Sequence, residues 1–275
     1  MPISLEDNFE DILKKAATGL RVGKNELALH AGLERYQLDN LMRGQLDDQS
    51  LLKCAERLSL NPKACLRIAL GEYQPAELSV PGLVQLNLPY DHPVIGRMWV
   101  NCYIVYSERS RKAALFDCGP DVDAIVEIIE QHDLKLDNIY LTHNHRDHVA
   151  GLTALRQKIG KRTIHLNENE NRPDTKSFSE GKSFGIGRLQ VETLLTSGHT
   201  PGGTTFVING LEKPVAIVGD SILAGSICGA PDSYQEALDN IRKKILTLPP
   251  ETILCPGHGP MTTVAEEWAN NPFFA

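Results

Sequence analysis

The strongest chemical signal in the sequence is a group of histidine and aspartate side chains that follows an apolar run. Residues 139–148 read Ile-Tyr-Leu-Thr-His-Asn-His-Arg-Asp-His, which places His143, His145, Asp147 and His148 within six positions. Neutral imidazole and carboxylate groups are donors that borderline divalent ions such as Zn²⁺ accept. Three of the nine histidines fall in this short stretch, so the pattern favours a metal site over a solvated polar loop.

The spacing of these residues indicates more than one ion. His143 and His145 are two positions apart, and alternate residues of an extended segment point the same way. Asp147 and His148 follow at a point where we expect the chain to turn into a helix. One short loop therefore offers two sets of ligands, and we expect two metals.

Three more candidate ligands follow strand-like runs later in the chain. His199, Asp220 and His258 each lie beside glycine, in Ser-Gly-His-Thr-Pro-Gly-Gly, Val-Gly-Asp-Ser and Cys-Pro-Gly-His-Gly-Pro. Strand ends are where layered α/β folds gather their binding residues. Each signal is weak alone, because a histidine beside glycine is often a turn residue and Asp220 could cap a helix. Combined with the upstream cluster, the set becomes specific.

Together these motifs resemble the metallo-β-lactamase superfamily, and within it the glyoxalase II-type hydrolases. The resemblance spans about residues 83–273 and includes Asn101-Cys-Tyr-Ile-Val, Phe116-Asp-Cys-Gly, Ala224-Gly-Ser-Ile and the tail after His258. It implies an α/β fold, an αββα sandwich with metals at one edge.

The resemblance also assigns roles to the seven residues. It implies two divalent ions, with zinc expected and iron or manganese as alternatives. The first metal would be held by His143, His145 and His199, the second by Asp147, His148 and His258, with Asp220 as the bridge. Asp147 would also orient the attacking hydroxide, which makes it the candidate catalytic residue.

These roles imply hydrolysis of a small thioester, as in hydroxyacylglutathione hydrolysis, by a hydroxide that bridges the metals. Lactonase and phosphodiesterase activities use the same metal pair and stay open. A persulfide dioxygenase with one iron on His143, His199 and Asp220 is a further alternative. A DNA-binding regulator with a metabolite-sensing metal domain is an alternative of another class.

Two departures from the glyoxalase II pattern bear on the substrate. Only a short tail follows His258, so the chain resembles the single-domain relatives that lack a helical glutathione-binding domain. Gly229 stands where those proteins usually have arginine. Arg172, Lys176 and Lys182 lie on a polar loop between ligand sites, where they either meet an anionic substrate or are simply solvated.

Residues 1–78 are expected to form a separate all-α domain, joined to a catalytic domain over 79–275 by a proline-containing linker. Residues 25–44 resemble the lambda-repressor-like helix-turn-helix family, with a glycine between two amphipathic stretches. Residues 1–78 carry 10 Lys/Arg against 12 Asp/Glu, and DNA-binding domains usually have a basic face. We therefore expect these helices to pair two copies of the chain or to cover the site, not to bind DNA.

The composition is that of a soluble globular protein. Hydrophobic residues make up 41% and charged residues 23%, which excludes a disordered chain, and the net charge of −7 argues against broad nucleic-acid affinity. The six cysteines include no Cys-x-x-Cys pair, and neither a signal peptide nor a spanning segment is evident. We expect reduced thiols, no membrane association and a cytoplasmic location.

Alternation of apolar runs with helical patterns predicts the elements beyond residue 82. Helices are expected over 121–131 and 234–246. Strands are expected over 83–88, 99–106, 113–116, 139–141, 163–166, 189–195, 204–208, 215–218 and 252–255.

Overall fold

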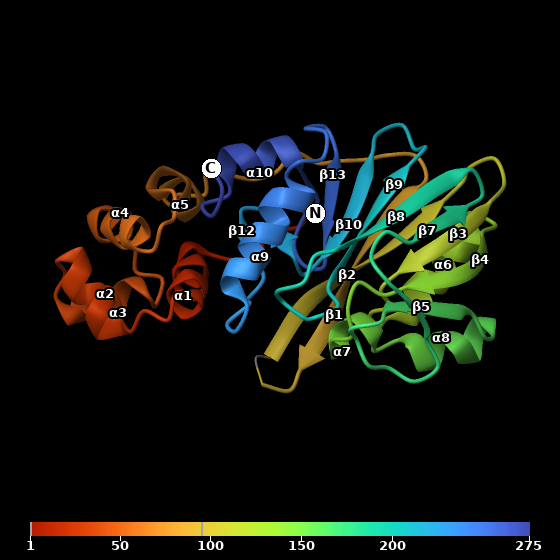
Figure 1. Ribbon diagram of the computed structural model, residues 1–275, viewed down its shortest axis with the longest axis horizontal. Coiled ribbons are helices and arrows are strands. Elements are labelled where there is room, and N and C mark those ends of the chain that lie inside the picture. The colour runs from red at the N-terminus through yellow and green to blue at the C-terminus, as the bar shows by residue number, and fades with distance from the viewer. Residues whose placement is uncertain (1, 95) are drawn as a thin grey trace.

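The computed structural model describes residues 2–94 and 96–275 of the chain. Five helices at the N-terminal end lie beside a larger body in which two β-sheets face each other between helices (Figure 1). The mixed α/β class and the helical N-terminal segment expected from the sequence are both present.

Each of the two main sheets has six strands. The first has the order β1-β2-β3-β4-β5-β6, antiparallel from β1 to β3 and parallel from β3 to β6. Its strands are β1 Leu83–His92, β2 Gly96–Tyr106, β3 Lys112–Phe116, β4 Lys135–Tyr140, β5 Thr163–Asn167 and β6 Lys176–Phe178. The second has the order β14-β13-β10-β9-β8-β7. Its strands are β7 Ser183–Ile186, β8 Leu189–Leu195, β9 Thr204–Asn209, β10 Val215–Gly219, β13 Ile253–Pro256 and β14 Thr262–Thr263.

Apolar side chains on the facing sides hold the sheets together. Phe116 and Tyr140 of the first sheet pack on Phe206 of the second, with ring centroids 5.3 and 5.6 Å apart. The outer faces are covered as well, so central strands such as β10 are buried along their whole length. The first sheet is covered by α6 Val122–Gln131 and α8 Leu152–Ile159. The second is covered by α9 Tyr234–Asn240, the π-helical turn η1 Ile241–Ile245 and α10 Val264–Asn270. These layers form the expected αββα sandwich.

All nine expected strands and both expected helices are present, with ends that shift by a few residues. The second helix is not uniform, because α9 passes into the π-helical turn η1 at Ile241. The short strands β6, β7 and β14 and the two-stranded ribbon of β11 Ile222–Leu223 and β12 Ser226–Ile227 were not predicted. Segments of two to four residues carry too little periodicity to be recognised from sequence.

Two of the N-terminal helices begin at side-chain caps. The Asp47 carboxylate accepts a hydrogen bond from the Ser50 amide at 2.9 Å, and Asn61 accepts one from the Ala64 amide at 3.0 Å. Such caps satisfy amides that the first helical turn leaves unpaired. The helices are α1 Phe9–Gly19, α2 Lys24–Ala31, α3 Arg35–Leu41, α4 Asp48–Arg57 and α5 Pro62–Ala69.

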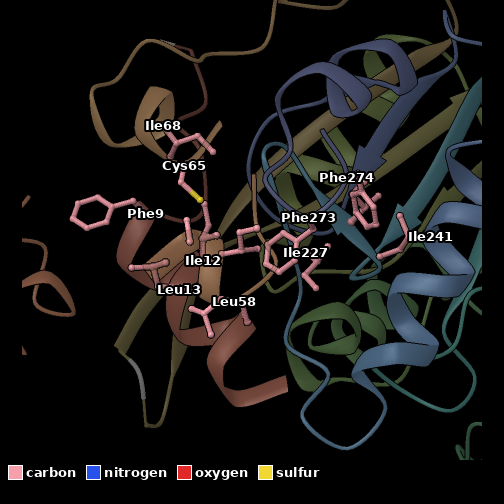
Figure 2. Packing of buried hydrophobic residues seen from close by; sticks show 14 of the residues in the cluster. Phe9, Ile12, Leu13, Leu58, Cys65, Ile68, Ile227, Ile241, Phe273 and Phe274 are labelled. Atoms are coloured by element: carbon pink, nitrogen blue, oxygen red, sulfur yellow. The ribbon is translucent and has the colours of Figure 1, made fainter. Parts of the chain in front are cut away.

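These helices share one hydrophobic core with the sandwich. Ile12 and Leu13 of α1 lie in the same buried cluster as Ile227 and Phe273 from the far end of the chain (Figure 2). The domain boundary near residue 78 stays a prediction, but the apolar face of α1 is packed against the α/β body. The helical segment is therefore tied to the second sheet and its neighbouring loops.

Two further findings concern the cysteines and the length of the helices. All six cysteines are buried and none forms a disulfide. In the part of the chain that the structure describes, no helix is both long and apolar enough to span a bilayer.

A buried carboxyl group joins the linker, α10 and the loop before β12. Glu267 is completely buried and accepts hydrogen bonds from the Tyr73 hydroxyl at 3.1 Å, Thr262 at 2.8 Å, Asn271 at 2.7 Å and the Gly225 amide at 3.0 Å. Burial raises the pKa of Glu267 to about 7, although these hydrogen bonds oppose the shift.

This shift predicts a stability that falls with pH. The folded protein keeps a proton on Glu267 that the unfolded chain loses near its ordinary pKa, so folding is favoured at low pH. The advantage, about 3 kcal/mol, is lost as the pH rises from about 5 to about 8. Denaturant unfolding should show this loss in the wild type but not in Glu267→Gln. Parallel pH profiles for the two proteins would contradict the assignment.

Candidate metal centre

The seven candidate ligands meet at one edge of the sandwich because their strands end there. In the second sheet, β8 and β9 are antiparallel, β9 and β10 are antiparallel, and β10 and β13 are parallel, so β8, β10 and β13 run the same way. His199 follows β8, Asp220 follows β10 and His258 follows β13. The remaining four come from the loop after β4 and the short helix α7 Arg146–Val149.

The first group of side chains consists of His143, His145, His199 and Asp220, whose donor atoms all lie within 4.8 Å of one another. The Nδ1 atom of His145 is 2.9 Å from Nε2 of His199. The Nε2 atoms of His143 and His199 are 3.9 and 3.4 Å from Oδ2 of Asp220. Four donors thus face a common centre.

The second group consists of Asp147, His148 and His258, again with donor atoms within 4.8 Å of one another. The Nε2 atoms of His148 and His258 are 3.6 and 3.4 Å from Oδ2 of Asp147. Asp220 also reaches this group, with Oδ1 3.3 Å from Nε2 of His148 and Oδ2 3.4 Å from Nε2 of His258. Asp220 therefore lies between the groups, in the place expected for a bridge.

Three of the histidines are held by an oxygen atom on the side away from the site. These oxygens can only accept, so in the neutral imidazole each Nδ1 carries the hydrogen and each Nε2 faces the common centre with its lone pair. The pairs are His148 Nδ1 with Asp117 Oδ2 at 2.9 Å, His199 Nδ1 with the Gly229 carbonyl at 2.7 Å, and His258 Nδ1 with the Trp99 carbonyl at 2.6 Å.

Asp117 orients two of the candidate ligands. Besides contacting His148, its carboxylate accepts hydrogen bonds from the Thr142 amide and hydroxyl, both at 2.8 Å. The Thr142 oxygen lies 3.0 Å from Nδ1 of His143 and accepts its hydrogen. In the sequence, Asp117 stands out only as part of the Phe116-Asp-Cys-Gly motif, which assigns it no role. Asp117 could have been found by the same sequence pattern that identified Asp220, namely an acidic residue directly after a buried strand.

The donor atoms fit metal ions. Nε2 of His143, Nε2 of His148 and Oδ1 of Asp220 are buried side-chain atoms without a hydrogen-bond partner among the described residues. A buried polar atom left unpaired costs about 1–3 kcal/mol, more when it is charged. Divalent ions would pair all three atoms at once, and nitrogen with carboxylate oxygen is the donor set that zinc and iron use.

Burial and neighbouring charges shift the pKa values of these groups in opposite directions. Burial lowers the pKa of His143 well below its usual value. Burial also opposes a charge on Asp220, yet His258 and His148 hold the pKa of that carboxyl well below its usual value. Burial likewise disfavours a charged His148, but Asp220 and Asp117 raise its pKa to about 10. Metal binding requires neutral imidazole and should therefore release protons from this group.

Close packing and exposure define how the site is reached. A Cβ atom at Gly257 would lie 2.1 Å from Oδ1 of Asp220, so only glycine lets the chain before His258 pass this carboxylate.

His145 is exposed and His199 half-buried, whereas His143, His148 and His258 are buried. The site is therefore open to solvent on the side of His145 and His199.

The contacts of Asp117 predict its effect on metal affinity. Asp117→Asn keeps the size of the side chain but weakens its hold on His148 and on Thr142, and losses of such supporting contacts typically cost about 10–100-fold in metal affinity. Zinc dissociation constants from competition with a chromogenic chelator should rise accordingly. Asp137→Asn, at an exposed position of β4, is the control and should bind zinc like the wild type. Equal affinities for all three proteins would refute this role.

The comparisons with known proteins agree with this geometry. The family model of the metallo-β-lactamase superfamily matches residues 96–258, more than half of the chain, and leaves α1–α5 outside the match. A hydroxyacylglutathione hydrolase, GloC, of Haemophilus influenzae is 31% identical over 198 residues, which cover 63% of this chain and 92% of that protein. The mitochondrial persulfide dioxygenase ETHE1 of Mus musculus is 31% identical over 181 residues, covering 62% and 69%.

Solved structures show the same fold. The crystal structure of the BLEG-1 B3 metallo-β-lactamase superimposes with a TM-score of 0.56 at 27% identity, covering 69% of this chain and 99% of that one. The ETHE1 structure from Myxococcus xanthus superimposes with a TM-score of 0.58 at 25% identity, covering 69% and 83%. With its αββα sandwich and its His/Asp groups at the sheet edge, the chain belongs to the metallo-β-lactamase superfamily.

Proposed function

We propose that the protein is a dinuclear metal-dependent hydrolase of a small thioester, such as an acyl conjugate of glutathione or coenzyme A. The observation that carries the proposal is the position of Asp220, whose two carboxylate oxygens lie 3.3–3.4 Å from imidazole nitrogens of both groups. Such a site suits a pair of divalent ions, zinc first and iron or manganese as alternatives. Metal-dependent chemistry is common to the superfamily, whereas two ions and thioester cleavage are specific to this proposal.

Two divalent ions in these groups would supply hydroxide near neutral pH and stabilise the oxyanion of an attacked carbonyl. The chain itself would hold and orient the reacting groups. Asp220 would keep the two groups at a fixed separation, and Asp147, buried beside His148 and His258, would orient the nucleophile by accepting its hydrogen. The exposed edge at His145 admits the substrate.

A thioester suits this arrangement because a thiolate leaves without a strong general acid. An amide or a phosphodiester needs more help at the leaving group. A nearby cation supports an anionic substrate. The half-buried guanidinium of Arg172 donates to Oδ1 of Asn144 at 3.1 Å, and Asn144 lies between two candidate ligands. Arg172 would thus pair with the negative charge of the substrate, a role that Gly229, which has no side chain, cannot fill.

The similarity to a hydroxyacylglutathione hydrolase supports the thioester proposal. The second candidate, a persulfide dioxygenase with a single iron, is favoured by the similarity to the mouse enzyme of that name. It is also compatible with the first group, in which His143, His199 and Asp220 supply two imidazoles and a carboxylate.

Steady-state kinetics with a metal-replete protein separates these candidates. We expect hydrolysis of S-lactoylglutathione or simple acyl thioesters, with two metal ions per chain by elemental analysis. His145→Ala should lower kcat/KM more than about 100-fold, because losing a ligand should cost at least as much as losing a supporting contact. His30→Ala, an exposed histidine on α2, is the matched control. Thioester rates equal to those of His145→Ala, together with O₂ consumption on glutathione persulfide, would favour the dioxygenase instead.

For the N-terminal helices we propose a role in the protein's own architecture and not in DNA binding. Two basic side chains in this part of the chain are paired with an acid, since Asp39 lies 3.0 Å from Nε of Arg35 and 3.8 Å from Nζ of Lys24. Leu29 and Tyr36 are exposed on α2 and α3, where a second copy of the chain could pack. A cytoplasmic location, based on the expected reduced cysteines, is part of the same proposal.

This proposal predicts no strong binding to duplex DNA. A gel-shift experiment at physiological salt should show no sequence-specific complex with a dissociation constant below about 10⁻⁶ M, because the helical segment has no net positive charge to attract the DNA phosphates. A specific complex in the nanomolar range would show that the helices serve a regulator.

A further inference from the structure

His199 is the candidate ligand that contacts the loop ending at Gly229. It is half-buried at the solvent edge, and its Nδ1 atom is fixed by the Gly229 carbonyl at 2.7 Å. The backbone before it forms the turn Ser197–Gly198. Both of these supports, the loop that ends at Gly229 and the turn at Ser197–Gly198, are held from outside by elements that contact helix α1.

The first route runs through the loop of residues 221–229. This loop forms only the two-residue strands β11 and β12, and Gly225 within it has a φ of 70°. Such a loop has little stiffness of its own. The Lys15 ammonium of α1 donates to the Ile227 carbonyl at 2.9 Å, and Asp7 accepts from the Ser226 hydroxyl at 2.5 Å.

Lys15 and Asp7 also pair with each other, and both are largely shielded from water, with side chains 23% and 9% exposed. Removing one partner of such a shielded ion pair is costly, because the charge of the other partner is then left without compensation. Next to it, Ile227 lies in the same apolar cluster as Ile12 of α1 (Figure 2). Both hydrogen bonds and apolar packing therefore hold the loop of residues 221–229 against α1.

The second route runs through α9. A Cβ atom at Gly19, the last residue of α1, would lie 2.2–2.8 Å from ring atoms of Tyr234, so the helix backbone sits directly on this ring. One turn further along α9, Ala237 contacts the backbone of Gly198, where an added Cβ would fall 2.5 Å from the Ala237 Cβ.

The same helix fixes Ser197 through hydrogen bonds. Asn240 donates to the Ser197 carbonyl at 2.9 Å, and Glu236 accepts from its hydroxyl at 2.5 Å. A shift of α9 would therefore move the turn that leads into His199. Helix α1 thus touches both supports of one candidate ligand.

We propose that helix α1 and the segment before it are part of the metal-site scaffold, with Lys15, Asp7 and Gly19 acting as positioning residues for His199. The superfamily match begins only at residue 96, so this is a function of the added helical segment. The consequence is that the helical segment controls metal affinity at the group of His143, His145 and His199. The inference rests on metal binding by that group and is independent of the substrate.

The test is zinc affinity, measured by chelator competition on the full chain. The constant that belongs to the first group is identified as the one lost in His145→Ala. Lys15→Met and Gly19→Ala should each weaken this constant about tenfold, as the loss of a supporting contact does, and should leave zinc binding by Asp147, His148 and His258 within about twofold. Lys15→Arg should restore the affinity.

Matched controls separate positioning from general destabilisation. Lys14→Met removes a lysine from the exposed side of the same helix, where it pairs with Asp11. Gly23→Ala adds a Cβ where no atom lies within 4 Å. Both controls should bind zinc like the wild type. The proposal fails if Lys15→Met and Gly19→Ala keep wild-type zinc constants, or if both constants fall together with the melting temperature. A wild-type result here would leave thioester hydrolysis untouched, and absence of hydrolysis would leave this test valid.

Discussion

The buried carboxylate of Asp220 is the constraint around which the edge of the sandwich is arranged. An ionised carboxylate that is only 7% exposed is tolerated when partners surround it, and here these are imidazole nitrogens of His148, His199 and His258. His199 and His258 follow the ends of β8 and β13, whereas His148 lies on α7, so the parallel course of β8, β10 and β13 and the position of α7 decide whether these side chains meet. Gly257 supplies the space for this approach.

Hydrogen bonds behind the imidazole rings orient the nitrogen atoms that face the site. Carbonyls or carboxylates behind His148, His199 and His258 fix the nitrogen that faces the site, and Asp117 does so for two ligands at once. These supports come from the residue after β3, from strand β2, which lies between β1 and β3, and from the loop of residues 221–229 that α1 contacts. Catalytic positioning of this kind needs precision below an ångström, which packed strands provide better than free loops.

Much of this could be predicted because the relevant signals are local. Residue type and the preceding apolar runs identify the cluster from His143 to His148 and the strand-end residues Asp220 and His258. Each strand of five or more residues also carries enough periodicity to be predicted. Contacts that depend on tertiary structure could not be predicted. Nothing local to Lys15 indicates that its ammonium reaches the Ile227 carbonyl, 212 residues away, and the backbone carbonyl of Gly229 has no sequence signature.

The central claim is that Asp220 joins two metal-holding groups in one site. Anomalous diffraction at the zinc edge from crystals of the zinc-loaded protein tests it most directly. We expect two zinc peaks per chain, one within bonding distance of His143, His145 and His199, the other within bonding distance of Asp147, His148 and His258, with Asp220 bonded to both. A single peak that Asp147, His148 and His258 do not contact would contradict it.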